Sequence, residues 1–280
     1  MKDKKRKYDK AFGTSNIKKA RTAWKYIRFG LTLAKFPPIG RFLKNFMGVE
    51  SSNGSEIPIN KSLELPDNVI LPFAVTEHFI ENASLIFKMN YCGCRKRGNC
   101  EKYDHSIGCL WLGRGVERIN VPPEIGHIAT KEEALELERK AYEAGLVPSI
   151  GRIKADSWLM GALPDEGHFM SLCHCCPCCC VLGKLRYGPK EFSNIIQRME
   201  GISVHVNEEL CVGCGTCTKV CVFRDALKLI NGKAHINQDN CKGCGRCASK
   251  CPRKAITIKI DNLESINQAI DRIQAHVDVT

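Results

Sequence analysis

Two copies of one cysteine pattern constrain this 280-residue chain more than any other feature of its sequence. The copies are Cys211, Cys214, Cys217 and Cys221, then Cys241, Cys244, Cys247 and Cys251. Three thiolates in one tight loop can reach three irons of a cubane cluster, and glycines between them let backbone amides face its sulfides. Zinc accepts CxxC pairs but gives no reason for the third and fourth cysteines of each run. The spacing therefore predicts two [4Fe–4S] clusters.

Residues 202–261 resemble the bacterial ferredoxins that hold two [4Fe–4S] clusters. The resemblance implies a ferredoxin-like βαββαβ module with pseudo-twofold symmetry, in which the fourth cysteine of each run serves the other cluster. One cluster would be held by Cys211, Cys214, Cys217 and Cys251, and the other by Cys241, Cys244, Cys247 and Cys221. Val222 replaces the proline usual after the first run, which alters a local turn and removes no ligand.

The remaining cysteines lie upstream in two groups. The first is Cys92, Cys94, Cys100 and Cys109, and the second is Cys173, Cys175, Cys176, Cys178, Cys179 and Cys180. The first group has the four thiolates that one cluster needs. In the second group, adjacent side chains of an extended segment point to opposite faces, so all six thiolates cannot bind one ordinary cubane.

Two arrangements of the upstream thiols stay open. Four cysteines of the second group bind a cluster and two remain packed thiols or a redox-active pair. Alternatively, the two groups pool their thiols in two clusters or in one larger cluster. The whole chain is thus expected to hold two to four [4Fe–4S] clusters.

Several polar residues near these cysteines have two interpretations each. Arg95, with Lys96 and Arg97, could offset the negative charge of a cluster or form a solvated surface. His78 and His105 could be metal ligands, but hydrogen bonding near the cluster is the preferred interpretation for each.

The upstream region contains a CxCR segment with two later cysteines, the helix TKEEALELERKAYEAGLV and a CxCCxCCC run. This combination is similar to a set of prokaryotic multi-cluster ferredoxin-like proteins, mostly from anaerobes, over residues 69–260. The similarity implies electron transfer beside a larger oxidoreductase and no single reaction. Within the helix, Thr130 and Glu133 have the spacing of a capping box.

We expect an α+β chain of five parts. Residues 1–50 form a basic amphipathic helical extension that begins with a charged disordered tail, and residues 51–68 form a polar linker. Residues 69–190 form a mainly helical, cysteine-rich Fe–S domain, and residues 202–261 form the dicluster module. Residues 262–280 form a C-terminal helix whose apolar positions have helical spacing, so that it packs back on the body.

The net charge of +12 is concentrated at the N-terminus. Residues 1–50 carry nearly all of it, and bound clusters, each about −2 when oxidised, make the rest acidic. Nucleic-acid binding is therefore disfavoured. Ile17, Ala20, Trp24, Ile27 and Leu31 mark one apolar face of a cationic helix. This helix can dock a partner, pack on its own body or bind an anionic membrane surface, in that order of preference.

The sequence thus predicts an electron-transfer protein that relays electrons through several clusters to or from a larger flavin- or metal-containing oxidoreductase. The alternative is a reductase whose active-site cluster or thiol pair lies in Cys173–Cys180. A self-contained enzyme is the less favoured of the two, because the chain lacks glycine-rich nucleotide motifs. With no secretory signal and many paired cysteines, we expect a reducing cytoplasm, with peripheral binding at the inner membrane surface as an option.

Overall fold

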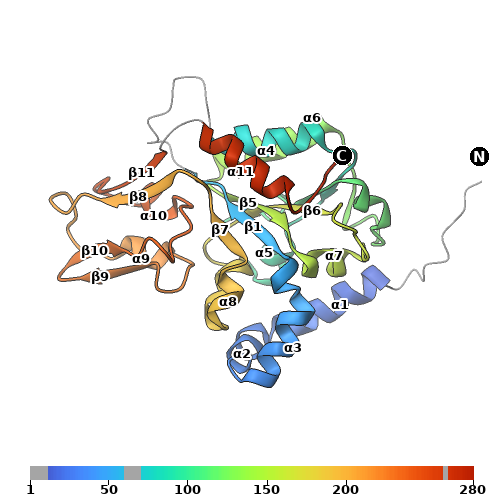
Figure 1. Ribbon diagram of the computed structural model, residues 1–280, viewed down its shortest axis with the longest axis horizontal. Helices are drawn as coiled ribbons and strands as arrows, with labels where there is room; N and C mark the ends of the chain where they lie inside the picture. The colour runs from blue at the N-terminus through green and yellow to red at the C-terminus, as the bar shows by residue number, and fades with distance from the viewer. Residues whose placement is uncertain (1–11, 60–70, 261–263) are drawn as a thin grey trace, which may run out of the picture.

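The computed structural model describes residues 12–59, 71–260 and 264–280 (Figure 1). The charged tail predicted for the first ten residues lies outside the described residues, as do linker residues 60–68. No helix in the described ranges is long and apolar enough to cross a bilayer.

A seven-stranded sheet forms the centre of the molecule, with strand order β4-β2-β3-β6-β5-β1-β7. All neighbours are antiparallel except β1 and β7, which are parallel. The strands are β1 Asn53–Glu56, β2 Ile86–Met89, β3 Leu110–Leu112, β4 Gly126–Ile128, β5 Val147–Arg152, β6 Met170–Cys175 and β7 Ile196–Arg198.

Helices cover both faces of this sheet (Figure 1). On one face α4 (Leu71–Asn82) and α6 (Lys131–Glu143) pack against the sheet, and α11 (Glu264–Gln274) packs on α4. On the other face lies α7 (Lys154–Met160), in contact with the N-terminal helices α1 (Phe12–Trp24) and α3 (Pro37–Met47). The remaining helices before the dicluster module are α2 Ile27–Leu33, α5 Gly93–Arg97 and α8 Lys190–Ser193, with 3₁₀ turns η1 Val49–Ser51, η2 Arg114–Arg118 and η3 Leu182–Tyr187.

Two predicted helices form as their sequence patterns indicate. At the start of α6, the Thr130 hydroxyl accepts from the Glu133 amide while the Glu133 carboxylate accepts from the Thr130 amide, which confirms the capping box. The apolar positions of α11, among them Ile266, Ala269 and Ile270, are buried. The C-terminal helix therefore packs back on the body, as predicted.

Two sequence-based expectations need correction. The region 69–190 contains more helix than strand, but a sheet that was not predicted lies at its centre. Strands of three to six residues are too short to show a clear alternating pattern in the sequence. Residues 53–59 belong to the folded body and not to the polar linker predicted over 51–68. Residues 53–56 form β1 between β5 and β7, and Ile57 is fully buried. This strand was not predicted, because small and polar residues such as Asn53 and Ser55 are equally typical of a loop.

The N-terminal helices pack on the body of the same chain. The Asn16 side chain donates to the carbonyl of Trp158 on α7 at 2.7 Å, and Leu31 and Ala34 are buried against Leu185. The second of the three expected packing modes is therefore present. A set of large aromatic residues on this segment nevertheless remains exposed to solvent: Tyr26, Phe29, Phe36, Phe42 and Phe46.

The C-terminal module runs in the order strand, helix, strand, strand, helix, strand. Its strands pair as two antiparallel ribbons, β8 with β11 and β9 with β10. One hydrophobic core is shared with the sheet domain, because Ile57 and Val204 belong to the same buried cluster. The elements are β8 Ile202–Val206, α9 Thr216–Val220, β9 Leu227–Ile230, β10 Lys233–Ile236, α10 Arg246–Ser249 and β11 Ile256–Ile260.

Candidate metal centres

The C-terminal module brings its eight cysteines together as two sets of four. Each set lines a small cavity of about 20 Å³. The first cavity is lined by Cys211, Cys214, Cys217 and Cys251, and the second by Cys221, Cys241, Cys244 and Cys247. In each cavity the fourth cysteine comes from the other run, as the predicted crossing requires.

Backbone amides surround these sulfurs in the way a cluster needs. The amides of Ala234 and Ala255 donate to Cys211 Sγ at 3.4 Å and to Cys251 Sγ at 3.3 Å. Gly245 begins α10 with φ of +81°, and a Cβ there would meet the carbonyl oxygen of Ile59 at 2.2 Å. Hydrogen bonds to ligand sulfurs stabilise and tune iron–sulfur clusters, so the donor set and its surroundings fit this group.

Upstream, Cys100, Cys176, Cys178 and Cys179 form a four-thiol group. All four sulfurs lie within 4.8 Å of one another, and those of Cys100 and Cys178 are 3.5 Å apart. Gly98 permits this packing, because a Cβ at that position would lie 2.9 Å from Cys179 Sγ. The set has the number and spacing of ligands for one cubane cluster or a tetrahedral metal ion.

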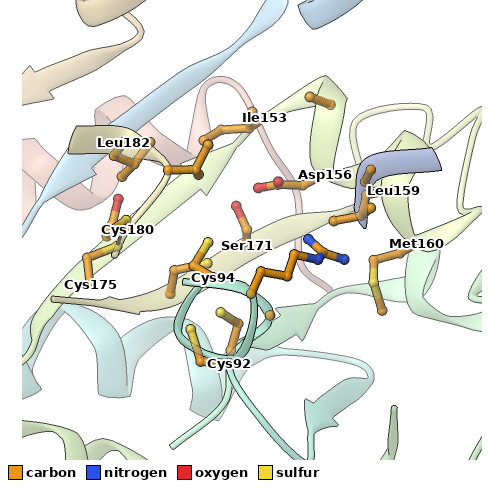
Figure 2. A pocket seen from close by; sticks show the side chains of 18 of the residues that line it. Cys92, Cys94, Ile153, Asp156, Leu159, Met160, Ser171, Cys175, Cys180 and Leu182 are labelled. Carbon is orange, nitrogen blue, oxygen red and sulfur yellow. Dashed lines mark hydrogen bonds between the residues drawn. The ribbon is translucent and has the colours of Figure 1, made fainter. Parts of the chain in front are cut away.

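The other six upstream cysteines form a second, six-thiol group around one larger cavity of about 410 Å³. They come from the start of α5, the residue before β3, strand β6 and the turn after it: Cys92, Cys94, Cys109, Cys173, Cys175 and Cys180. Alternation along β6 places Ser171, Cys173 and Cys175 on the same face of the sheet. Figure 2 shows Cys92, Cys94, Cys175 and Cys180 gathered around this space.

Several thiols of this group shift the pKa values of their neighbours. The pKa of Cys92 falls to about 2, because Cys109 and then Cys94 hydrogen-bond to its sulfur. The pKa values of Cys94 and Cys109 rise well above the ordinary range, because hydrogen bonds to Cys180 and Cys173, respectively, together with burial disfavour further thiolates. Neighbouring thiolates repel one another, so the thiols around this cavity can ionise together only if positive charge lies between them. Bound iron ions would supply that charge.

Arg95 lies between the two upstream groups. Its side chain is fully buried and donates to the carbonyl oxygens of His174, at 2.7 Å, and Ile107. Burial alone would lower its pKa, but the charges of Cys92, Cys109 and other thiolates raise it. Of the two interpretations of this residue, charge compensation near the thiols is therefore the one that agrees with its position.

Arg246 connects the dicluster module to the six-thiol group. Its Nη1 donates to Cys244 Sγ at 3.4 Å, and its Nη2 donates to the carbonyl oxygen of Cys175 at 3.3 Å. Its charge is balanced by Glu56 of β1, whose Oε2 lies 3.2 Å from Nη1 in a fully buried ion pair. Sequence reasoning missed both residues. In the sequence, Arg246 is marked only as a charged residue within a cysteine run, and no sequence feature marks Glu56 as functional.

The histidines near the thiols hydrogen-bond to protein groups. His174 is buried between Glu138 and the carbonyl oxygen of Gly108, at 2.7 Å from the latter. Burial alone would lower its pKa, but Glu138 raises it. His105 Nε2 bonds to the carbonyl oxygen of Cys100 at 2.7 Å, and His78 bonds to Gln274. These contacts agree with the hydrogen-bonding interpretation of His78 and His105.

The grouping of the upstream thiols corrects one expectation. The cysteines at 92, 94, 100 and 109 do not meet as one set, because Cys100 joins Cys176, Cys178 and Cys179, whereas the other three line the large cavity. The six cysteines between 173 and 180 are likewise divided, three to each group. The structure therefore supports pooled thiols, as four and six, over a separate site in each sequence group.

Comparison with known protein families supports the C-terminal assignment. Residues 203–260 match the family described as a 4Fe-4S dicluster domain. The match includes both cysteine runs, so this module binds two [4Fe–4S] clusters. The comparison with curated proteins found no match for this chain.

Proposed function

We propose that this chain, whose residues 203–260 are a 4Fe–4S dicluster domain, relays electrons between a redox partner and two further iron centres in its upstream domain. The module takes the ferredoxin-like βαββαβ arrangement, with the crossed ligand sets described above. The four-thiol group holds a third cluster, and the six-thiol group holds a fourth centre. The relay is supported above all by Arg246, which contacts both Cys244 and the main chain of Cys175.

The order of the centres follows from their surroundings. Cys214 of the first cavity is exposed, whereas the second cavity adjoins Arg246 and the upstream thiols. Each cluster supplies one-electron chemistry when bound. The protein contributes the fixed positions of the thiolates and the buried charges of Arg95 and Arg246 near them. Electrons would thus enter or leave at the exposed cluster and reach the upstream centres through the second.

The partner docks at an apolar rim around the exposed cluster. Four large apolar side chains of this rim are 41 to 62% exposed: Leu210, Val212, Leu229 and Ile230. Val212 and Leu229 also line the first cavity, so a protein seated on the rim would lie next to its cluster. A flavin- or metal-containing oxidoreductase that presents an apolar surface beside its own cofactor fits this position.

The exposed aromatic residues of α2 and α3 suggest a separate attachment to an anionic bilayer surface. Phe29, Phe36 and Phe42 are 63 to 68% exposed, and Arg28, Lys35 and Arg41 stand next to them in the sequence. Aromatic side chains flanked by cations are suited to the interface of an anionic membrane. This surface lies on elements other than the rim around the exposed cluster, so both contacts can form together.

Iron and sulfide analysis of the anaerobically purified chain tests the number of centres. We expect at least about 16 irons per chain, because the two upstream groups add to the eight irons of the dicluster domain. Cys178→Ala should lose about four irons, because it removes a ligand of the four-thiol group only. Thr22→Ala, at an exposed residue of α1 that lies outside every thiol group, is the control. About eight irons in the parent chain would contradict the proposal.

A reductase is the second candidate function, and the large cavity is the observation that favours it. A protein that only transfers electrons needs no ligand cavity beside the last metal centre of its relay. In this chain all six thiols of the second upstream group face a cavity with room for a small molecule.

A further inference from the structure

The cavity beside the six-thiol group has two unlike sides. The thiols line one side, whereas the other is formed by apolar residues that offer no metal ligand, among them Ile17 and Ala20 of α1 and Leu159 of α7. A centre bound to the thiols occupies their side and leaves the side formed by α1 and α7. The centre and this remaining space share the cavity's volume of about 410 Å³, so the ligand must be small.

One carboxyl group faces this cavity. Asp156 of α7 lies opposite Ser171 of β6, and Figure 2 shows both above Cys94. Burial raises the pKa of Asp156 to about 6, although Ser171 opposes this change. The Ser171 hydroxyl also donates to the carbonyl oxygen of Gly151 at 3.0 Å. Near neutral pH a part of the Asp156 population is protonated and can donate a hydrogen bond into the cavity.

Helix α1 forms the outer cover of the cavity. It is fixed to α7 by the hydrogen bond from Asn16 to the Trp158 carbonyl, while Phe46 of α3 packs edge-on against the Trp158 ring at 5.2 Å. The cover thus comes from residues that precede β1 in the sequence. Because Ile17, Ala20 and Trp24 present carbon to the cavity, its outer side offers shape and apolar contact but few polar partners.

We infer that this cavity is a binding site for a small, uncharged, mainly apolar molecule with one hydrogen-bond acceptor, such as a carbonyl oxygen, directed at Asp156. The site deepens the proposed function, on which it rests for the redox centre next to the ligand. A charged ligand is disfavoured because it would lose its hydration against the apolar walls of α1 and α7. Lys19, Arg95 and Arg97 also line the cavity, but Arg95 already donates to two carbonyl oxygens and Lys19 is exposed to solvent.

Equilibrium dialysis of the cluster-loaded, full-length chain tests the ligand class with four probes of similar size. We expect acetophenone to bind saturably at one site per chain, more tightly than ethylbenzene, which lacks the acceptor. Benzoate and benzylammonium should bind more weakly than either. Absence of saturable binding of acetophenone, or tighter binding of a charged probe, would overturn the inference.

Variants then locate the site. Ala20→Trp fills the cavity from α1, and Leu159→Trp fills it from α7; each should weaken acetophenone binding about tenfold or more. Thr22→Trp is the matched control, because Thr22 lies on the same helix, is exposed and does not line the cavity. Its affinity should stay within about twofold of the parent. Equal affinities in all three variants would place the ligand elsewhere and refute the site.

Asp156→Leu tests the hydrogen bond. The substitution should weaken acetophenone binding about threefold to tenfold, the usual worth of one hydrogen bond, and leave ethylbenzene unchanged. Equal losses for the two probes would refute the role of the carboxyl. Iron content is measured in each variant. Full iron with no acetophenone binding rejects the binding site alone, whereas missing upstream iron rejects the proposed relay.

Discussion

Arg246 and Glu56 form a buried ion pair at the junction between the dicluster module and the sheet domain, where neither charge reaches solvent. Removal of one partner from such a pair leaves an uncompensated buried charge, whereas removal of both does not. The pair also places a positive charge next to Cys244, which we propose as a ligand of the second cluster. These two residues are therefore expected to matter more for stability than their positions in the sequence suggest.

Substitution of Arg246 tests this at the level of single residues. Arg246→Met should lower the free energy of unfolding by about 3–5 kcal/mol, because Glu56, whose pKa burial already raises, would lose its partner in the interior. The double variant Arg246→Met with Glu56→Gln should recover most of that loss. Thermal unfolding of the loaded protein measures both, with the exposed Arg253→Met as control. A double variant no more stable than the single one would contradict the account.

Asp156 gives a pH-dependent prediction. Its pKa is about 6 in the folded chain against an ordinary 3.8, so the folded state binds this proton more tightly than the unfolded state. The stability that the protonated carboxyl contributes is therefore lost as the pH rises toward and through 6. Relative to the parent, Asp156→Asn should gain about 1 kcal/mol more at pH 7.5 than at pH 5. Unfolding midpoints at the two pH values measure this gain, and a gain independent of pH would refute it.

At the scale of elements, local sequence patterns predicted those structures that local interactions determine. The capping box located the start of α6, and apolar spacing located α11. The strand β1 was missed because residues 53–56 have no apolar alternation; their burial comes from β5 and β7, which lie about 100 and 140 residues away. Pooling of the upstream thiols was one of two predicted alternatives, but their division into four and six was not predicted, because Cys100 and Cys176 are distant in sequence and meet only in the folded domain.

The exposed aromatic residues of α2 and α3 give a prediction about a surface. The chain should bind vesicles that contain anionic lipid and should release them at high salt. Phe29→Ser combined with Phe42→Ser should weaken vesicle binding about tenfold or more, because each buried aromatic ring contributes about 1.5–3 kcal/mol. Ile128→Ser, at a residue that is 56% exposed on β4, is the control. Equal binding by the double variant and the control would contradict bilayer attachment and favour a protein occupant of this surface.

For the whole molecule, the sequence predicted the dicluster module most completely, because each cysteine run places three of its four thiols in one cavity by itself. The upstream domain requires the complete sheet to divide its ten cysteines into groups of four and six. The result is a chain of thiol sites from an exposed cluster to a covered cavity, joined at Arg246. This arrangement agrees with the proposed relay, whose last centre lies beside the proposed small-molecule site.

Low-temperature EPR during stepwise reduction of the anaerobic chain tests this account most directly. It predicts signals from upstream centres in addition to the two interacting cubanes of the dicluster domain, with magnetic coupling between the second cubane and the six-thiol centre. A spectrum that contains only two interacting cubanes at every level of reduction would contradict the relay.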